Sequence, residues 1–544
     1  MSLSSLRRTP ALAAVLAFAC LSVAAVRGGD RGPEKKAWPA EAPESCTSVQ
    51  VGRLASEDGS VMTSHTCDGN YRQWLTVVPG AKRAPGAVNK IMSGKLFTET
   101  PWDMRGVVTA GEVPEIAETY AFLNTAYPCL NEKGLAIGES TIMGREELYN
   151  PEGMFMIEEI ERLMLERCTT ARDAIRLAGE LVRKYGYGDY GECIAVADAK
   201  EVWHVEIFGA GPLAKGGVWA AVRIPDDHVG VSANIPRISR IDLGDPEHYM
   251  ASDNVHSLAE EMGFWDPKSG KPFRFWEAYS GKKPFDVREF YVLSTLAPSL
   301  KLDRAAEELP FSVKPEKKLA VRDMLRLYRN TYEGHAFDQT KNLKVPKAKD
   351  DPQPVPSPVA TPWLSREWVA LLNTLKPGTI EPARPIAAPY CSYATVLQVR
   401  GWLPPSVGAI CWFAFDNSAQ SVRIPIFAGV AELLPSFEVS AQHRFRMDSA
   451  AWAFRRANRL ATVKWGATRK VLEDTIREYE DKAFADLPGI EKEVLRIQAS
   501  TAPDKEPLTA SAYLTRYTND FARAAIQKYI ELGDRFWAMF ASGF

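Results

Sequence analysis

Short apolar runs alternate with clusters of turn residues over most of the chain. The segments 47–56 and 60–67 flank Asp58 and Gly59, a pattern that predicts a β-hairpin. Three further turn clusters lie between apolar runs and predict neighbouring strands, namely residues 131–134, 198–200 and 225–227. Because many of these runs are almost continuously apolar, we expect strands that are buried on both faces.

A helical period appears in two places. Residues 151–168 carry an apolar stripe, and the next segment opens at Thr170 with Asp173 three residues on, as in a capping box. From Ser449 onward the period is helical throughout, so we expect the last ~100 residues to form a helical layer. Strand pairs that surround a helix pair are typical of an α+β fold with helices packed on stacked antiparallel sheets.

The N-terminus has the pattern of an export signal. Arg7 and Arg8 precede an apolar run over 11–26, which is shorter than the ~20 residues that span a bilayer comfortably. We therefore predict a cleaved signal over 1–26 rather than a retained anchor. The protein is then exported, to the periplasm or the medium, with no stable membrane insertion once the signal is removed.

The remaining chain divides by composition. Residues 27–45 are rich in Gly, Pro and charge and have no period, which indicates a linker or pro-segment. We predict one domain over 46–435 with a Pro- and Lys-rich surface excursion at 340–363. A helical C-terminal region follows over 436–544. A homo-oligomer is compatible with this organisation.

Composition excludes several classes of function. The chain has 544 residues, 46% of them apolar, and a formal net charge of -2, so nothing favours nucleic acid as a partner. The eight cysteines form no CxxC pair and the seven histidines are scattered, which predicts neither a metal site nor a cofactor. Loss of Cys20 with the signal leaves seven cysteines, an odd number that indicates a free thiol or an intermolecular partner.

Cys46 is the best candidate for that thiol, because it directly follows the featureless segment. Cleavage before Cys46 would place a thiol and a new α-amine on one residue. An α-amine has a pKa of ~7.7–8.0 and can act as a base near neutral pH. A thiol beside an amine base is an activated nucleophile, and no distant histidine is required.

These residues resemble a known family. The stretch "CTSVQVGRLASEDGS" followed by "HTCD" is similar to the start of the dipeptidase A family, cysteine peptidases among the N-terminal-nucleophile hydrolases. Secernins, penicillin V acylase and bile-salt hydrolases are related to it. The resemblance continues through "CLNEKGLAIGEST", "GECIAVADAKEVWHVEIFG" and "VGVSANIPRISRID" to about Gly429. It implies a four-layer αββα fold, self-cleavage before Cys46 and hydrolysis of small peptide substrates.

The resemblance also implies roles for individual residues. Cys46 matches the nucleophile, Asp68 the acidic residue that orients its amine and thiol, and Asn234 the asparagine that stabilises the oxyanion. His65 stands where many relatives carry an arginine, so its role in support or substrate binding is open. Arg400 lies on a late strand where an arginine facing the substrate is plausible.

Other interpretations stay open from the residues alone. Cys46 could be a buried structural thiol, Asp68 and Asn234 could serve only in turns, and the two remaining candidates could be ordinary strand residues. The principal functional prediction is an exported cysteine dipeptidase. The alternatives are an acylase that acts on N-acyl amides, of the penicillin V or bile-salt type, and a non-catalytic exported binding protein of the same fold.

Overall fold

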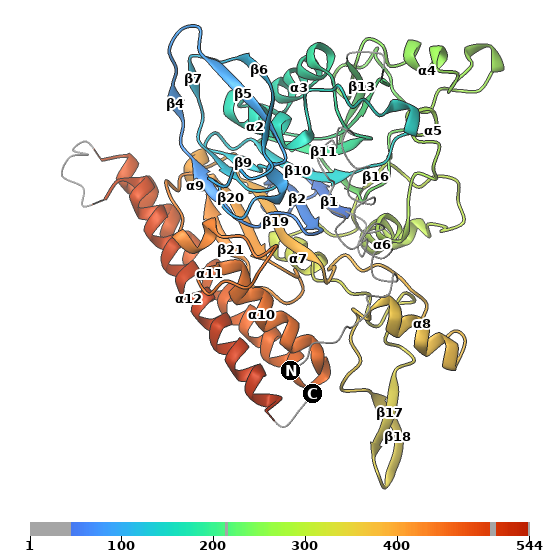
Figure 1. Cartoon of the computed structure of the whole chain (residues 1–544), viewed down its shortest axis with the longest axis vertical. Helices are drawn as coiled ribbons and strands as arrows, with labels where there is room; N and C mark the ends of the chain where they lie inside the picture. Colours follow the sequence, from blue (N-terminus) through green and yellow to red (C-terminus); the bar gives the residue numbers. More distant parts are fainter. Residues whose placement is uncertain (1–44, 213–215, 501–507, 542–544) are drawn as a thin grey trace, which may run out of the picture. The chain divides into compact units, whose positions relative to one another are not determined.

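Two large antiparallel sheets carry most strands of the described chain, which comprises residues 45–212, 216–500 and 508–541 of the computed structural model (Figure 1). The seven-stranded sheet has the order β16 (Ser312–Val313), β14 (Val229–Ser232), β1 (Ser45–Val51), β2 (Val61–Asp68), β19 (Cys391–Val399), β20 (Ala409–Phe415) and β21 (Ile424–Phe427). The eight-stranded sheet has the order β15 (Tyr249–Ala251), β13 (Gly217–Arg223), β12 (Val202–Gly209), β11 (Glu192–Ala197), β10 (Ala136–Thr141), β9 (Leu130–Asn131), β8 (Phe122–Asn124) and β3 (Thr76–Val78). The predicted signal over 1–26 and nearly all of the 27–45 segment lie outside the described residues.

The predicted N-terminal hairpin is confirmed. Strands β1 and β2 pair antiparallel, with Cys46 opposite Cys67. The turn between them uses Asp58, whose Oδ1 accepts the backbone N–H of Ser60 at 3.0 Å, and Gly59, whose φ of 83° is the left-handed conformation that glycine adopts easily. The turns at 131–134 and 198–200 likewise join antiparallel neighbours, β9 to β10 and β11 to β12.

The expectation of paired strands around 225–227 is wrong. Strand β13 belongs to the eight-stranded sheet, whereas β14 pairs with β1 in the other sheet. Residues 224–228 cross from one sheet to the other, because their carbonyls accept hydrogen bonds from the chain just after β1: Gly52 N–H donates to His228 and Leu54 N–H to Asp226. The apolar pattern predicted both strands, but it carries no information about which sheet each one joins.

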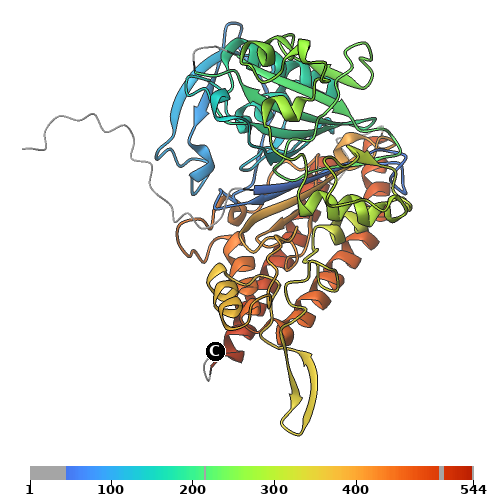
Figure 2. The same ribbon diagram turned by 90° about the vertical axis from the view of Figure 1, so that its right-hand side faces the viewer.

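The two sheets face each other closely. Strands β1 and β2 contact β10 and β11 of the other sheet. At Gly138 of β10 an added Cβ would lie 2.3 Å from the Ser64 carbonyl of β2, so only glycine allows this approach. In Figure 2 the blue and orange strands of the seven-stranded sheet lie between the green strands and the red C-terminal helices. Strands β2, β11 and β19 are buried along their full length.

Helices cover the other faces. Helix α3 (Ala171–Tyr185) packs on β11 and β13, and Thr170 caps it by accepting the backbone N–H of Asp173, as the sequence predicted. On the seven-stranded sheet, α10 (Ala450–Val463) contacts β20 and α12 (Ala510–Met539) contacts β21, while α11 (Trp465–Gln498) packs against both helices. The predicted C-terminal helices are thus confirmed. Among the described residues, no helix combines the length and apolar character that crossing a membrane requires.

The architecture is mixed, with antiparallel sheets and helices in separate layers, which agrees with the α+β class. Within 340–363 the structure has an exposed hairpin, β17 (Lys344–Ala348) and β18 (Asp351–Pro356). The remaining elements are β4 (Ala81–Lys82), β5 (Val88–Ser93), β6 (Val108–Pro114), β7 (Glu118–Thr119), α2 (Ile157–Arg167), α4 (Ser257–Glu261), α5 (Phe275–Tyr279), α6 (Val287–Leu296), α7 (Val321–Leu327), α8 (Arg366–Leu375), α9 (Pro405–Gly408) and the short 3-10 turns η1 (Lys95–Phe97), η2 (Glu146–Leu148), η3 (Pro267–Ser269), η4 (Pro298–Leu300) and η5 (Pro435–Glu438).

Candidate active site

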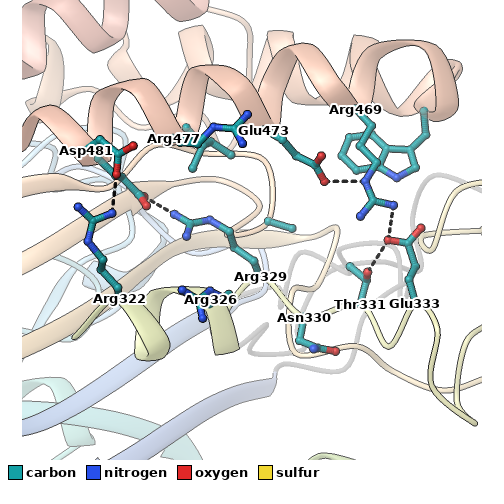
Figure 3. A pocket seen from close by; sticks show the side chains of 14 residues that line it. Arg322, Arg326, Arg329, Asn330, Thr331, Glu333, Arg469, Glu473, Arg477 and Asp481 are labelled. Carbon is teal, nitrogen blue, oxygen red and sulfur yellow. Dashed lines mark hydrogen bonds and ion pairs between the residues drawn. The ribbon is translucent and has the colours of Figure 1, made fainter. Parts of the chain in front are cut away.

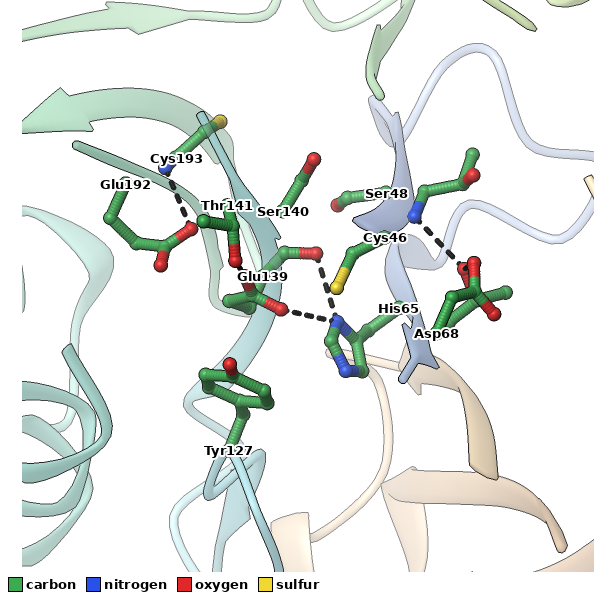
Figure 4. A network of polar contacts seen from close by, with 12 residues as sticks. Cys46, Ser48, His65, Asp68, Tyr127, Glu139, Ser140, Thr141, Glu192 and Cys193 are labelled. Atoms are coloured by element: carbon green, nitrogen blue, oxygen red, sulfur yellow. Dashed lines mark hydrogen bonds and ion pairs between the residues drawn. The ribbon is translucent and has the colours of Figure 1, made fainter. Parts of the chain in front are cut away.

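Cys46 is the second residue of β1 and lies in the closely packed region between the sheets. Its side chain is completely buried, and Figure 4 shows its sulfur pointing toward His65 of β2 and Glu139 of β10. Burial raises the pKa of the Cys46 thiol well above its ordinary value, and the negative charge of Glu139 adds to the shift. In the chain with Ser45 attached, the thiol is therefore protonated at neutral pH.

The backbone nitrogen of Cys46 is held by Asn234. Its N–H donates to Asn234 Oδ1 at 2.9 Å, and Asn234 Nδ2 donates to the Thr141 carbonyl at 2.7 Å. Asn234 follows β14 with a φ of 68°, and its own N–H donates to Ser140 Oγ at 2.9 Å. Because donors face the oxygen and a carbonyl faces the nitrogen, the orientation of this carboxamide is fixed by its partners.

Arg288, from the first turn of α6, is a site residue that sequence reasoning missed. Its Nη1 donates to the Cys46 carbonyl at 2.5 Å and to Thr47 Oγ1 at 3.0 Å, and its Nη2 donates to Asn234 Oδ1 at 2.9 Å. Burial, reinforced by the neighbouring Arg384, lowers the pKa of Arg288 to about 10, so this guanidinium remains charged at neutral pH. It holds the carbonyl of Cys46 directly and its nitrogen through Asn234.

Asp68 closes the other side of the site. It ends β2 opposite Ser45 of β1, and its side chain is fully buried. Its Oδ2 accepts from Thr66 Oγ1 at 2.8 Å and from Arg384 Nη2 at 2.6 Å, whereas Oδ1 has no hydrogen-bond partner. Burial by itself lowers the pKa of the Arg384 guanidinium. The interactions with Asp68 and Tyr390 outweigh burial, so the pKa is raised. Arg384 was also absent from the sequence prediction.

His65 forms a buried pair with Glu139. The His65 Nδ1 atom lies 2.9 Å from the Glu139 backbone carbonyl and 3.1 Å from its carboxylate Oε2. The imidazole packs edge-on against Tyr127 with 5.4 Å between ring centroids, and Glu139 Oε1 accepts from Thr141 Oγ1 at 2.8 Å. One ligand-type atom from each of Cys46, His65 and Glu139 lies within 4.8 Å of the other two.

Arg400 does not join this group. Strand β19 runs antiparallel to β2 with Cys391 opposite Asp68, so Arg400, just past Val399, follows the opposite end of the strand. Its guanidinium donates to the Gly408 and Val407 carbonyls and pairs with Glu491. These contacts fix a turn and a helix, and they leave the prediction of a substrate-facing arginine without structural support.

A cavity of about 510 Å³ lies elsewhere, between α7 and α11 (Figure 3). Its arginines are paired with acids: Arg322 Nη1 lies 2.6 Å from Asp481 Oδ1, and Arg469 Nη1 lies 2.7 Å from Glu333 Oε2. None of the residues around Cys46 lines it. The polar set around Cys46 is therefore the better candidate for chemistry.

The structure thus brings together four of the five residues predicted from the sequence and adds three charged ones. Cys46, His65, Asp68 and Asn234 come from two neighbouring strands and the segment after a third. The missed residues are Glu139, Arg288 and Arg384. Glu139 lies in the family-like stretch "CLNEKGLAIGEST", which gives it no role. Asp286 followed by Glu289 predicts the start of α6 but gives Arg288 no chemical role.

Comparison with known proteins gives a consistent result. The model of peptidase family C69 matches residues 45–478. A probable dipeptidase from Salmonella dublin is 26% identical over 412 residues, 72% of this chain and 82% of its own length. A probable dipeptidase B from Lactococcus lactis is 23% identical and covers 90% of this chain and 94% of its own length. Dipeptidase A from Lactobacillus helveticus is 21% identical, covering 85% and 91% respectively.

Proposed function

The chain belongs to peptidase family C69, and on that premise we propose that it hydrolyses dipeptides or similar small amides with the thiol of Cys46, after the preceding segment has been removed. One observation carries the proposal: the Cys46 nitrogen, which cleavage would convert into an α-amine, is already held by Asn234 Oδ1 at 2.9 Å. Any buried backbone N–H needs an acceptor, but this one is a side-chain carboxamide that can stay in place when the amide becomes an amine.

The surrounding charges support the same chemistry. An α-ammonium gains two N–H donors over the amide, and Asp68 Oδ1 is a buried acceptor without a partner beside the Ser45–Cys46 bond. We assign to Asp68 and Asn234 the task of holding this amine. Arg288 fixes the Cys46 carbonyl, so the nucleophile is constrained from both sides.

The proposed reaction proceeds in two steps. The thiol proton passes to the α-amine, sulfur attacks the substrate carbonyl carbon, and the amide C–N bond breaks as the amine returns the proton to the leaving nitrogen. Water then hydrolyses the thioester and restores the thiol. Asn234 Nδ2, which now donates to the Thr141 carbonyl, is our candidate donor to the oxyanion. Kinetic measurements decide how much this Nδ2 donor contributes to the rate compared with the Oδ1 acceptor that holds the amine.

The proposal extends to fold, maturation and location. Two facing antiparallel sheets with the nucleophile near the start of a strand support the four-layer N-terminal-nucleophile fold. Self-cleavage would begin with attack of the Cys46 thiol on the Ser45 carbonyl. The basic residues and apolar run at the N-terminus support export, which fractionation of expressing cells can test.

The first residue and the intact mass of the active protein test the central claim. We expect a chain that begins at Cys46 and hydrolyses dipeptides faster than N-acyl amides of matched size. An active chain that retains Ser45 would refute the mechanism, because an acylated nitrogen cannot act as the base. Faster cleavage of the N-acyl amides would leave the nucleophile intact but assign the protein to acylase chemistry.

A further inference from the structure

We propose that Cys46, His65 and Glu139 form a zinc site, in which Zn²⁺ binds the thiolate, the imidazole and the carboxylate and so blocks the nucleophile. Binding itself does not depend on the proposed function; only the inhibition rests on it. The site draws on β1, β2 and β10, and therefore on both sheets. No local sequence spacing indicates it, because the fold brings together residues that are up to 93 positions apart (139 − 46).

The geometry fits the ion. The three ligand-type atoms lie within 4.8 Å of one another. A tetrahedral zinc ion with bonds of about 2.0–2.3 Å holds its ligand atoms about 3.3–3.6 Å apart. No pair of ligand atoms therefore needs to close by more than about 1.5 Å. All three residues are buried, with exposed fractions of 0% for Cys46, 2% for His65 and 1% for Glu139, so backbone and packing already limit their positions.

The charges fit as well. A thiolate and a carboxylate supply two negative charges and the neutral imidazole none, so a divalent cation makes the buried set neutral. Glu139 Oε2 makes no hydrogen bond and faces His65 Nδ1 at 3.1 Å. Zinc would displace the proton of the thiol, whereas the neutral imidazole binds through a lone pair and keeps its proton on the other ring nitrogen.

The described chain contains a second buried set of cysteine, histidine and glutamate, around Cys193, whose ligand-type atoms are arranged differently. Cys193 Sγ lies 3.5 Å from His204 Nε2, and Glu206 Oε1 lies 2.9 Å from that same nitrogen. However, Glu206 Oε1 also accepts backbone N–H groups of Arg237 and Ile238. These bonds occupy only Oε1, since Glu206 Oε2, like Glu139 Oε2, has no hydrogen-bond partner. The two sets differ in spacing: in the part of the chain that the structure describes, only the Cys46 set holds its three ligand-type atoms within 4.8 Å of one another, which makes Cys193 a matched control.

Cobalt and zinc titrations of the purified full-length product, first stripped with EDTA, test the proposal. We expect about one tightly bound equivalent, a thiolate-to-cobalt absorption band, and protection of Cys46 from iodoacetamide by Zn²⁺ as read by peptide mass spectrometry. Hydrolysis should fall in proportion to zinc bound and recover with EDTA. Glu139→Gln should weaken zinc binding at least 10-fold, as even loss of an outer-shell partner often does.

Controls separate this site from others. Cys193→Ala and His248→Gln, the latter in an exposed His–Asp pair, should bind zinc like the wild type. Melting curves check that each variant folds. A cobalt band that survives in Cys46→Ala, or unchanged zinc affinity in folded Glu139→Gln, would overturn the site. Zinc binding as expected in a protein whose Cys46→Ala variant still hydrolyses dipeptides would instead refute the proposed function alone.

Discussion

The described chain contains two buried sets of cysteine, histidine and glutamate, around Cys46 and around Cys193. In both, burial raises the pKa of the thiol well above its ordinary value, and in both a glutamate adds to the shift. Residue type and burial therefore do not distinguish them. Position in the strand does not distinguish them either, since each cysteine is the second residue of its strand. The partners of the two glutamates differ, and Cys46 alone directly follows the 27–45 segment.

Around Cys193 the polar atoms serve the fold. The sulfur belongs to an apolar cluster that includes Phe208 and Tyr279, and Glu206 anchors the backbone after Asn234 through two N–H groups. Around Cys46 the polar atoms converge on a peptide bond and on the sulfur beside it. Asn234 and Arg288 hold the two sides of Cys46, and Asp68 retains a buried oxygen without a partner. An unused acceptor alone does not indicate chemistry, because Glu206 Oε2 near Cys193 also lacks a partner. The side chains that hold both the nitrogen and the carbonyl of Cys46 do.

The largest expected effect is a contrast between two alanine variants. Cys46→Ala should lose hydrolysis by about 10⁴-fold or more, since loss of a nucleophile removes the covalent pathway. Cys193→Ala should retain activity and lose only about 1 kcal/mol of stability. Steady-state assays and thermal melting measure the two quantities. Activity that survives in Cys46→Ala, or vanishes in a folded Cys193→Ala, would reverse the assignment of the two sets.

The second contrast concerns the groups that hold the nucleophile. Asn234→Ala should lower kcat by about 10²–10³-fold with little change in KM if its amide stabilises the oxyanion. If Asn234 instead only holds the amine, the loss should shrink as the pH rises and the free amine becomes abundant. A change in KM alone would make Asn234 a substrate-binding residue. Measuring kcat and KM across pH separates these outcomes.

Sequence reasoning predicted what lies within a segment and failed where the fold joins segments. The Asp58–Gly59 turn fixes the hairpin that carries Cys46 and Asp68, because glycine conformation and strand periodicity are local properties. The partner of β14 depends instead on tertiary hydrogen bonds of 224–228, which no pattern of apolar residues encodes.

The same division applies to the site. Cys46 was predicted because it follows a featureless segment, and Asp68 and Asn234 were predicted through the family resemblance. Arg288 and Glu139 sit within ordinary helix and strand patterns, and only the approach of α6 and β10 to β1 gives them a role. Arg400 shows the reverse case. The sequence predicts a site residue at a strand end, whereas the structure places its guanidinium on a turn and beside Glu491.

The third contrast is between the two glutamates. Glu206→Ala should lower the free energy of unfolding by about 2–4 kcal/mol, because two buried backbone N–H groups and a buried histidine lose their hydrogen-bond acceptor. Glu139→Gln keeps the shape and the Thr141 contact, so its cost should be nearer 1 kcal/mol. Chemical denaturation at pH 7 measures both. Equal losses would mean that the Cys46 set is as structural as the other.

The smallest effect is a difference in thiol reactivity with pH. In the uncleaved chain, burial and Glu139 raise the pKa of Cys46, so the neutral thiol prevails below that pKa. Only the thiolate reacts. While the pH is below the pKa, each rise of one pH unit increases the thiolate population about tenfold. Alkylation of Cys46 in uncleaved chains should therefore keep rising between pH 7 and 9 without a plateau.

Processing should change that profile for one cysteine only. A new α-ammonium beside Cys46 favours the thiolate, so alkylation of processed chains should level off at lower pH, whereas Cys193 stays slow in both forms. Site-resolved mass spectrometry of the two fractions, separated by intact mass, gives the rates. Asp68→Asn should shift the processed profile back toward high pH, because the ammonium loses its buried counter-charge. Identical Cys46 profiles before and after processing would show that the amine does not act on the thiol. An unchanged profile in Asp68→Asn would leave Asp68 as a turn residue at the end of β2.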